Sequence, residues 1–105
     1  MAINIHTTLV VVAAHRQQFL VLMKRIQAIQ TEAGWKLVGS YQNRTGKFHT
    51  FIHVWELDDF NHYQTGLEYC FAQPDIDHIV AGLAECLESE TVNFIESVDY
   101  LAVEE

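Results

Sequence analysis

The sequence has few of the residues that interrupt or cross-link a chain. Of its 105 residues one is proline, five are glycine and two are cysteine. It contains no low-complexity run and no internal repeat, so we expect one ordered domain over residues 1–105. Cys70 and Cys86 lie in helical patterns and lack CxxC spacing, which indicates buried thiols with no redox or metal role.

Positive charge is also scarce. Six Lys and Arg stand against 14 Asp and Glu, for a net charge of −8, which argues against nucleic acid as a partner because phosphate backbones are repelled. The longest wholly apolar run, residues 9–14, has six residues, whereas a membrane-spanning helix needs about 20. No signal-peptide pattern opens the chain. We therefore expect a soluble, cytoplasmic protein without membrane segments.

Hydrophobic periodicity predicts the order β-α-β-β-α-β. A β-branched, alternating first segment indicates a strand, and the spacing of apolar residues after it indicates a helix that Gly34 ends. Turn residues at 43–46 predict a hairpin, and Asp58 or Asp59 is suited to cap the next helix. The predicted elements are a strand over 3–12, a helix over 13–33, strands over 35–43 and 47–57, a helical section from 60 that Pro74 divides, and a strand over 91–103.

This order is the ferredoxin-like α+β pattern, an antiparallel four-stranded sheet with helices on one face. Both faces of residues 48–57 are largely apolar, although a sheet with one face in water alternates apolar and polar residues. Because the helices of one chain cover one face, the other face needs a partner. We therefore predict a homodimer in which two sheets face each other.

The third predicted strand supplies the candidate site. We assign its aliphatic side, with Ile52 and Val54, to the helices, so its other side faces the interior between the two sheets. On the first strand the apolar alternate positions go to the helices and the polar ones to that interior. The two strands are neighbours in a ferredoxin-like sheet, so these side chains would share a cavity. The predicted ligand-binding residues are Asn4, His6, Thr8, His49, Phe51, His53 and Trp55.

His53 and His6 are the candidate catalytic residues, because an imidazole titrates near neutrality and can act as acid or base. Trp55 offers a flat apolar wall to a planar ligand. The alternative interpretation is that His53 is a hydrogen-bonded core histidine and Trp55 a core side chain. No metal is expected, since His49 and His53 would lie about 13 Å apart along a strand. The absence of GxGxxG, GxSxG and P-loop spacing argues against nucleotide and acyl-transfer sites.

The segment LVGSYQNRTGKFHTFIHVWELDDFNHY, residues 37–63, resembles the NIPSNAP family. The similar features are the LVG segment, a hairpin glycine, a His-x-Trp-Glu strand end and an acidic start to the next helix. The segment INIHTTL is similar to the family's first strand, and a Phe-Leu pair at Phe19 and Leu20 follows it. The family usually carries a basic residue in that strand where His6 stands here, so a role that needs a permanent cation there is in question.

The resemblance implies the dimeric α+β barrel fold, in agreement with the two-faced sheet. The wider superfamily includes cofactor-free monooxygenases, haem-degrading enzymes, isomerases and binding modules. Asn4, Trp55 and His62 or His78 are loosely similar to the haem-degrading pattern, but the spacing to the histidine does not fit. We hypothesise a NIPSNAP-like protein that binds a small, flat, largely apolar molecule in the barrel cavity, without cofactor or metal. The alternatives are a cofactor-free monooxygenase or isomerase that uses a cavity histidine, and a non-catalytic protein-interaction dimer. The sequence does not decide between enzyme and binding protein.

Overall fold

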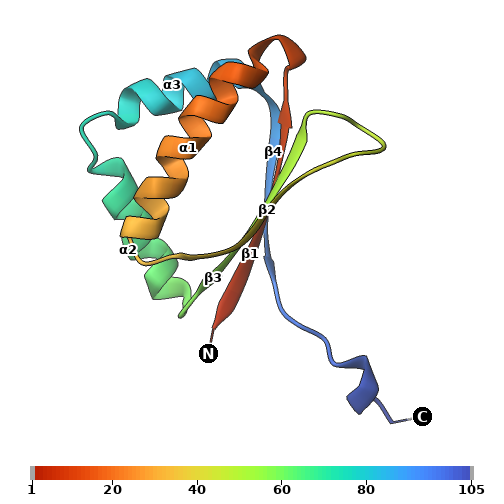
Figure 1. Cartoon of the computed structure of the whole chain (residues 1–105). Coiled ribbons are helices and arrows are strands. Elements are labelled where there is room, and N and C mark those ends of the chain that lie inside the picture. Colours follow the sequence, from red (N-terminus) through yellow and green to blue (C-terminus); the bar gives the residue numbers. More distant parts are fainter. Residues whose placement is uncertain (1, 105) are drawn as a thin grey trace.

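Three helices cover one face of a four-stranded antiparallel sheet in the computed structural model, which describes residues 2–104 (Figure 1). The strand order is β2-β3-β1-β4, and this arrangement confirms the predicted ferredoxin-like α+β fold. The elements are β1 (Ile3–Val11), α1 (Arg16–Glu32), β2 (Lys36–Gln42), β3 (Thr50–Leu57), α2 (Phe60–Phe71), α3 (Ile76–Cys86) and β4 (Leu87–Ile95), with short 3-10 helices η1 (Ala13–His15) and η2 (Tyr100–Ala102).

Local signals place the end of α1 and the start of α2 correctly. Gly34 follows α1 with a φ of 95°, a left-handed conformation that glycine adopts without strain. The side chain of Asp59 caps α2, since its Oδ1 accepts a hydrogen bond of 2.8 Å from the backbone N–H of His62. None of the helices within residues 2–104 is long and apolar enough to cross a bilayer.

The start of β3 and both ends of β4 differ from the prediction. β3 begins at Thr50, not at residue 47, because the hairpin connection includes left-handed residues at Gly46 and His49. β4 begins at Leu87, directly after α3, where the backbone becomes extended, and it ends at Ile95. The chain after β4 leaves the sheet, and the side chain of Asp99 accepts from the N–H of Leu101 to start η2 in place of a strand (Figure 1).

The predicted assignment of the two faces of β3 is wrong. Trp55 pairs with Ile5 and His53 pairs with Thr7 across the β1–β3 ladder, and both lie on the face that the helices cover. Ile52 and Val54 are half-buried on the open face. The physical reason is area, because aromatic rings bury more apolar surface than aliphatic side chains. Accordingly, the ring of Phe51, on the same face as His53, packs 4.8 Å from that of Phe19, while Trp55 packs 5.9 Å from Trp35.

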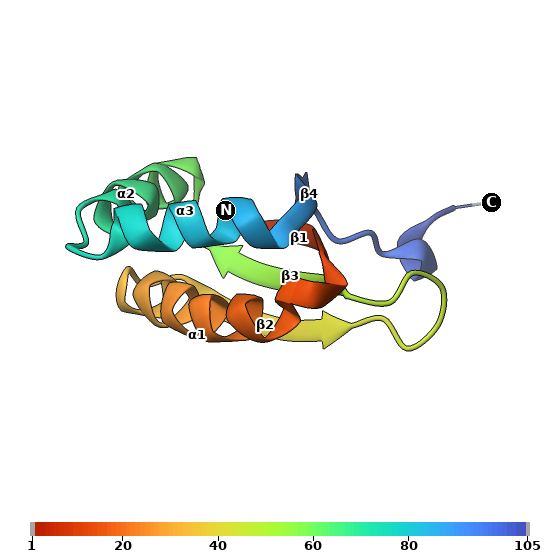
Figure 2. The same cartoon turned by 90° about the horizontal axis from the view of Figure 1, so that it is seen from above.

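The core between the sheet and the helices has two parts. One contains Leu9, Phe19, Leu22, Ile29, Phe51 and Ile79, and the other contains Ile5, Trp35, Trp55 and Leu57. The assignment of Ile5 and Leu9 to the helix side is confirmed. No helix lies over the opposite face of the sheet within residues 2–104, as the view from above also shows (Figure 2).

Candidate functional site

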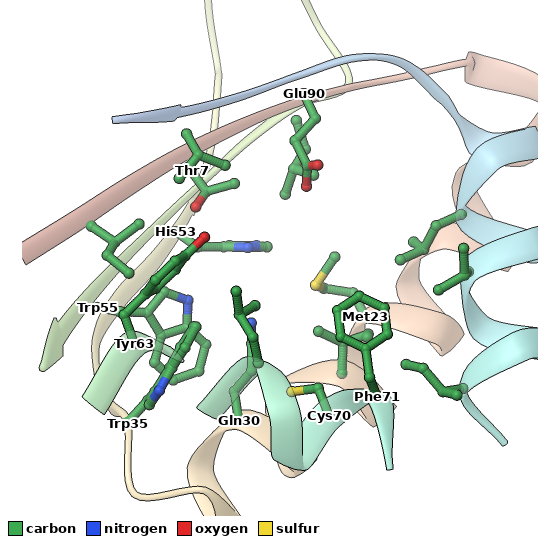
Figure 3. Close-up of a pocket in the computed structure, with 18 residues that line it drawn as sticks. Thr7, Met23, Gln30, Trp35, His53, Trp55, Tyr63, Cys70, Phe71 and Glu90 are labelled. Carbon is green, nitrogen blue, oxygen red and sulfur yellow. The ribbon is translucent and has the colours of Figure 1, made fainter. Parts of the chain in front are cut away.

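A cavity of about 260 Å³ lies between the sheet and the three helices (Figure 3). Side chains of both core parts form most of its wall, and only a few polar groups reach it. An apolar concavity with a small number of polar groups is typical of small-molecule sites. The lining residues that matter for its chemistry are Thr7, Trp35, His53, Trp55, Tyr63 and Cys70.

His53 is the distinctive polar side chain of this cavity. It is 6% exposed, and neither ring nitrogen forms a hydrogen bond with another described residue within residues 2–104. Figure 3 shows its ring directed into the cavity, on the wall where Thr7 stands opposite it in the ladder. Burial lowers the pKa of His53 below its ordinary value, because the charged form loses hydration. At neutral pH the ring is therefore uncharged and offers a ligand one donor and one acceptor nitrogen.

Aromatic rings form the end of the cavity near α2. Trp35 stacks on Tyr63 with ring centroids 5.6 Å apart and meets Trp55 edge to face at 5.9 Å. Its Nε1 donates a hydrogen bond of 3.3 Å to the backbone oxygen of His62, so the indole is held in one orientation. These rings give a flat ligand an apolar surface to lie against.

The remaining polar groups contribute less reactive chemistry. Burial raises the pKa of the Cys70 thiol, so the thiolate nucleophile is disfavoured. Thr7 presents a hydroxyl next to His53, while Gln30 on α1 and Glu90 on β4 also line the cavity (Figure 3). This set can bind an oxygen-bearing ligand and move a proton through His53, the one imidazole in the lining.

Two of the predicted site residues line this cavity, His53 and Trp55. Three others, Asn4, His6 and Thr8, lie on the open face of the sheet, since His6 pairs with Val54. The prediction that His6 and His53 meet is therefore wrong, because the two side chains are on opposite faces of the sheet.

The last two predicted residues lie beyond this cavity. His49 is in the connection before β3, with a φ of 61°, so it does not share a strand face with His53. Phe51 packs on Phe19 and lines a neighbouring groove.

Sequence reasoning missed Trp35 and Tyr63 as cavity residues. Trp35 falls in the short connection between α1 and β2, where strand periodicity assigns no face. Tyr63 belongs to the apolar stripe of α2, which predicted only that it faces the sheet. The signal that could have indicated an aromatic wall is a large aromatic residue just before the hairpin, Trp35, and another in the first turn of the helix after it, Tyr63.

A metal site receives no support from the donor side chains. Within residues 2–104, no three or more His, Cys, Asp or Glu side chains come together in a group able to hold an ion. Among the described residues that line the cavity, His53 is the only imidazole and would supply a single nitrogen ligand. The expected absence of metal and cofactor stays a prediction.

The lowered pKa of His53 predicts a pH dependence of stability. Below about pH 6.5 the unfolded histidine takes up a proton while the buried ring stays neutral down to its lower folded pKa. The free energy of unfolding should therefore fall as pH decreases through that window and show no contribution from His53 above it. Urea melts at pH 7.5 and pH 5 should show a smaller loss for His53→Gln than for the parent. Equal losses would contradict a neutral, buried His53.

The fold defines the class of the protein, a ferredoxin-like α+β domain. A sequence model of one family, described as NIPSNAP, matches residues 9–101. The chain belongs to the NIPSNAP family, which confirms the resemblance seen in residues 37–63. No curated protein matches the chain.

Solved structures share this fold at low sequence identity. A NIPSNAP family protein from Agrobacterium tumefaciens is 17% identical, with a TM-score of 0.83 over 95% of this chain and 96% of that chain. A NIPSNAP domain protein from Burkholderia xenovorans is 20% identical, with a TM-score of 0.76 over 95% of this chain and 97% of that chain. SnoaB, a cofactor-independent oxygenase from Streptomyces nogalater, is 12% identical, with a TM-score of 0.70 over 97% of this chain and 98% of that chain.

Proposed function

We propose that this protein binds a small, flat, largely apolar molecule in the cavity between the sheet and the helices. The observation that carries the proposal is His53, a buried neutral imidazole with no hydrogen-bond partner among the described residues. The ring of His53 is directed into the cavity, so a ligand that forms a hydrogen bond with it there gains specificity. This cavity lies within one chain, between its sheet and its helices. The location predicted from the sequence was between the sheets of two chains.

A flat shape is favoured by the aromatic wall. The rings of Trp35 and Tyr63 are inclined by 19° and lie nearly parallel, and Trp55 closes the corner at 71° to Trp35. A planar ligand can stack against such a surface with little loss of conformational freedom, since it has few rotors to fix. An oxygen or nitrogen on its edge would then reach the ring of His53.

A second candidate function is cofactor-free catalysis at the same place. A neutral imidazole can take a proton from an acidic hydroxyl or carbon of the ligand, which leaves an electron-rich anion in an apolar cavity. Isomerisation needs only the return of that proton to another atom, whereas oxygenation would also consume dioxygen. The oxygenase candidate is favoured by the shared fold of SnoaB, and a binding protein would show neither reaction.

The test uses the two tryptophans of the chain, because both line the cavity. The neutral quencher 1-nitronaphthalene should quench their fluorescence with saturation at one molecule per chain. Val92 lies at the cavity rim on β4 and is 44% exposed, so Val92→Phe can narrow the cavity while the fold stays intact. It should weaken binding about tenfold, or about 1.4 kcal/mol.

The matched control is Val21→Phe, an exposed position of α1 outside the lining. It should bind the quencher as the parent does. His53→Ala should abolish proton transfer in the catalytic alternative, observed as exchange of an acidic ligand proton with solvent. Unsaturable quenching, or equal affinities of parent and Val92→Phe, would refute ligand binding in this cavity.

We also propose that two copies associate through the open face of the sheet. Ile52 and Val54 stand there half-buried, with Tyr41 and Ile95 at its edges, and helices cover only the other face. Light scattering after size exclusion should give a dimer for the parent and a monomer for Val54→Glu, because a charge would be buried without a partner. Val21→Glu on α1 should remain a dimer. A monomeric parent at micromolar concentration would refute the interface.

A further inference from the structure

A second hollow lies along the other side of His53. It is a groove of about 380 Å³ between α1 and β2, and it shares His53 and Met23 with the first cavity. Its floor is apolar and partly aromatic, formed by Phe19 and Phe51, whose rings are 4.8 Å apart. Its rim is polar. We name this hollow the α1–β2 groove, and its remaining lining residues are Leu20, Lys24, Gln27, Ser40, Tyr41 and Gln42.

Arg16 stands beside this groove without an acidic partner. Its guanidinium carbon lies 5.1 Å from the centre of the Phe51 ring, and its Nη2 donates a hydrogen bond of 2.9 Å to Oε1 of Gln42. Its Nη1 is buried and has no hydrogen-bond partner within residues 2–104. A buried guanidinium nitrogen without an acceptor is costly, which points to an acceptor supplied from outside the chain.

The surroundings make this lack of a partner unusual. The chain carries 14 carboxylate residues and six Lys and Arg, and another arginine of α1, Arg25, pairs with Asp75 at 2.8 Å. No carboxylate lies within 4.0 Å of Arg16 or Lys24 among the described residues. The groove therefore carries local positive charge on an acidic protein, and a bound anion would not be repelled by a nearby carboxylate.

The polar rim of the groove also contains neutral donors and acceptors from α1 and β2. Gln27 donates a hydrogen bond of 2.9 Å from Nε2 to Oγ of Ser40, so the hydroxyl hydrogen of Ser40 is left to donate to a ligand. Arginine binds a carboxylate through two parallel N–H groups more strongly than it binds neutral acceptors. The aromatic floor beside it accepts a planar ring.

We propose that the α1–β2 groove is a second ligand site, which takes an aromatic carboxylate. The ring lies against the apolar floor at Phe51, and the carboxylate pairs with the guanidinium of Arg16, whose side chain turns its buried Nη1 toward the groove, with Lys24 adding attraction along the groove. This site does not depend on the ligand of the first cavity. Because His53 and Met23 form a wall common to both, the two ligands would be bound side by side.

Calorimetry with 2-naphthoate and its methyl ester tests the site, since the two probes share a ring system and differ in charge. The acid should bind one molecule per chain and at least about tenfold more tightly than the ester. Saturation of the first cavity with 1-nitronaphthalene should leave naphthoate binding intact. Equal affinities of acid and ester, or displacement of naphthoate by 1-nitronaphthalene, would overturn the proposal.

Two variants locate the carboxylate. Arg16→Gln should reduce the preference for the acid at least about tenfold, whereas Arg44→Gln, which removes the same charge from the exposed β2–β3 connection, should retain it. Gln42→Glu places a carboxylate of the chain against Arg16 and should also abolish the preference for the acid over the ester. A glutamate oxygen can accept the same hydrogen bond from Arg16, so the variant keeps this contact. Full preference in both Arg16→Gln and Gln42→Glu would refute the role of Arg16. The two proposals can fail independently: if 1-nitronaphthalene does not bind, ligand binding in the first cavity is refuted, whereas the groove is judged by naphthoate alone.

Discussion

Gly66→Ala should destabilise the protein by about 3 kcal/mol, because a methyl group at this position of α2 would overlap the indole of Trp35. Trp35 cannot move aside easily. Its ring nitrogen is bonded to the backbone oxygen of His62, one face stacks on Tyr63, and Trp55 blocks its edge. The penalty should therefore exceed the gain of up to about 1 kcal/mol that alanine brings to a helix interior.

Gly82→Ala is the matched control, since Gly82 is also buried and lies inside a helix, α3. An added Cβ there would meet Cδ1 of Leu22 at 2.6 Å, the far end of a flexible side chain that can change rotamer. Gly82→Ala should therefore cost about 1 kcal/mol or less. Urea melts of both variants beside the parent measure the difference. Similar losses in the two variants would show that the Trp35 indole is not held as described.

The elements of this fold could be predicted because the signals for them are local. Gly34 and Asp59 mark helix ends through their own backbone and side-chain chemistry, and alternation along residues 3–11 places Ile5 and Leu9 on the helix side. The boundaries of β3 and β4 could not be predicted in the same way. They depend on a left-handed His49 and on an extended Leu87, neither of which a periodic pattern marks.

The site could be predicted only in part, because both faces of β3 are apolar. Alternation shows that His53 and Trp55 share a face with each other, but it does not show which face meets the helices. That choice depends on contacts with distant residues, above all Trp35 and Phe19. His53 and Trp55 line a cavity even so, because the hollow lies on the helix side of the sheet. His6, by contrast, faces the open side, and no pattern within β1 alone relates it to His53.

Trp55→Ala should cost about 3–5 kcal/mol of the free energy of unfolding, whereas His53→Ala should cost about 1 kcal/mol or less. The two residues share a face of β3 and line the same cavity, but their contacts differ. Trp55 is 2% exposed and packs on Trp35 and the second part of the core, so its loss removes a large buried surface. His53 leaves no partner unsatisfied among the described residues, and its removal enlarges a space that already exists.

Denaturant melts of the two variants, with 1-nitronaphthalene titrations of each, separate packing from binding. His53→Ala should keep a parent-like midpoint at pH 7.5 and lose less stability than the parent between pH 7.5 and pH 5, because the contribution of the titrating ring is gone. A loss of 3 kcal/mol or more in His53→Ala would mean that the ring supports the core, and the cavity would then lose its polar binding group. Since a ligand that binds only the folded protein stabilises it by RT ln(1 + [L]/Kd), the same concentration of quencher should raise the midpoint of the parent more than that of His53→Ala if the variant binds more weakly.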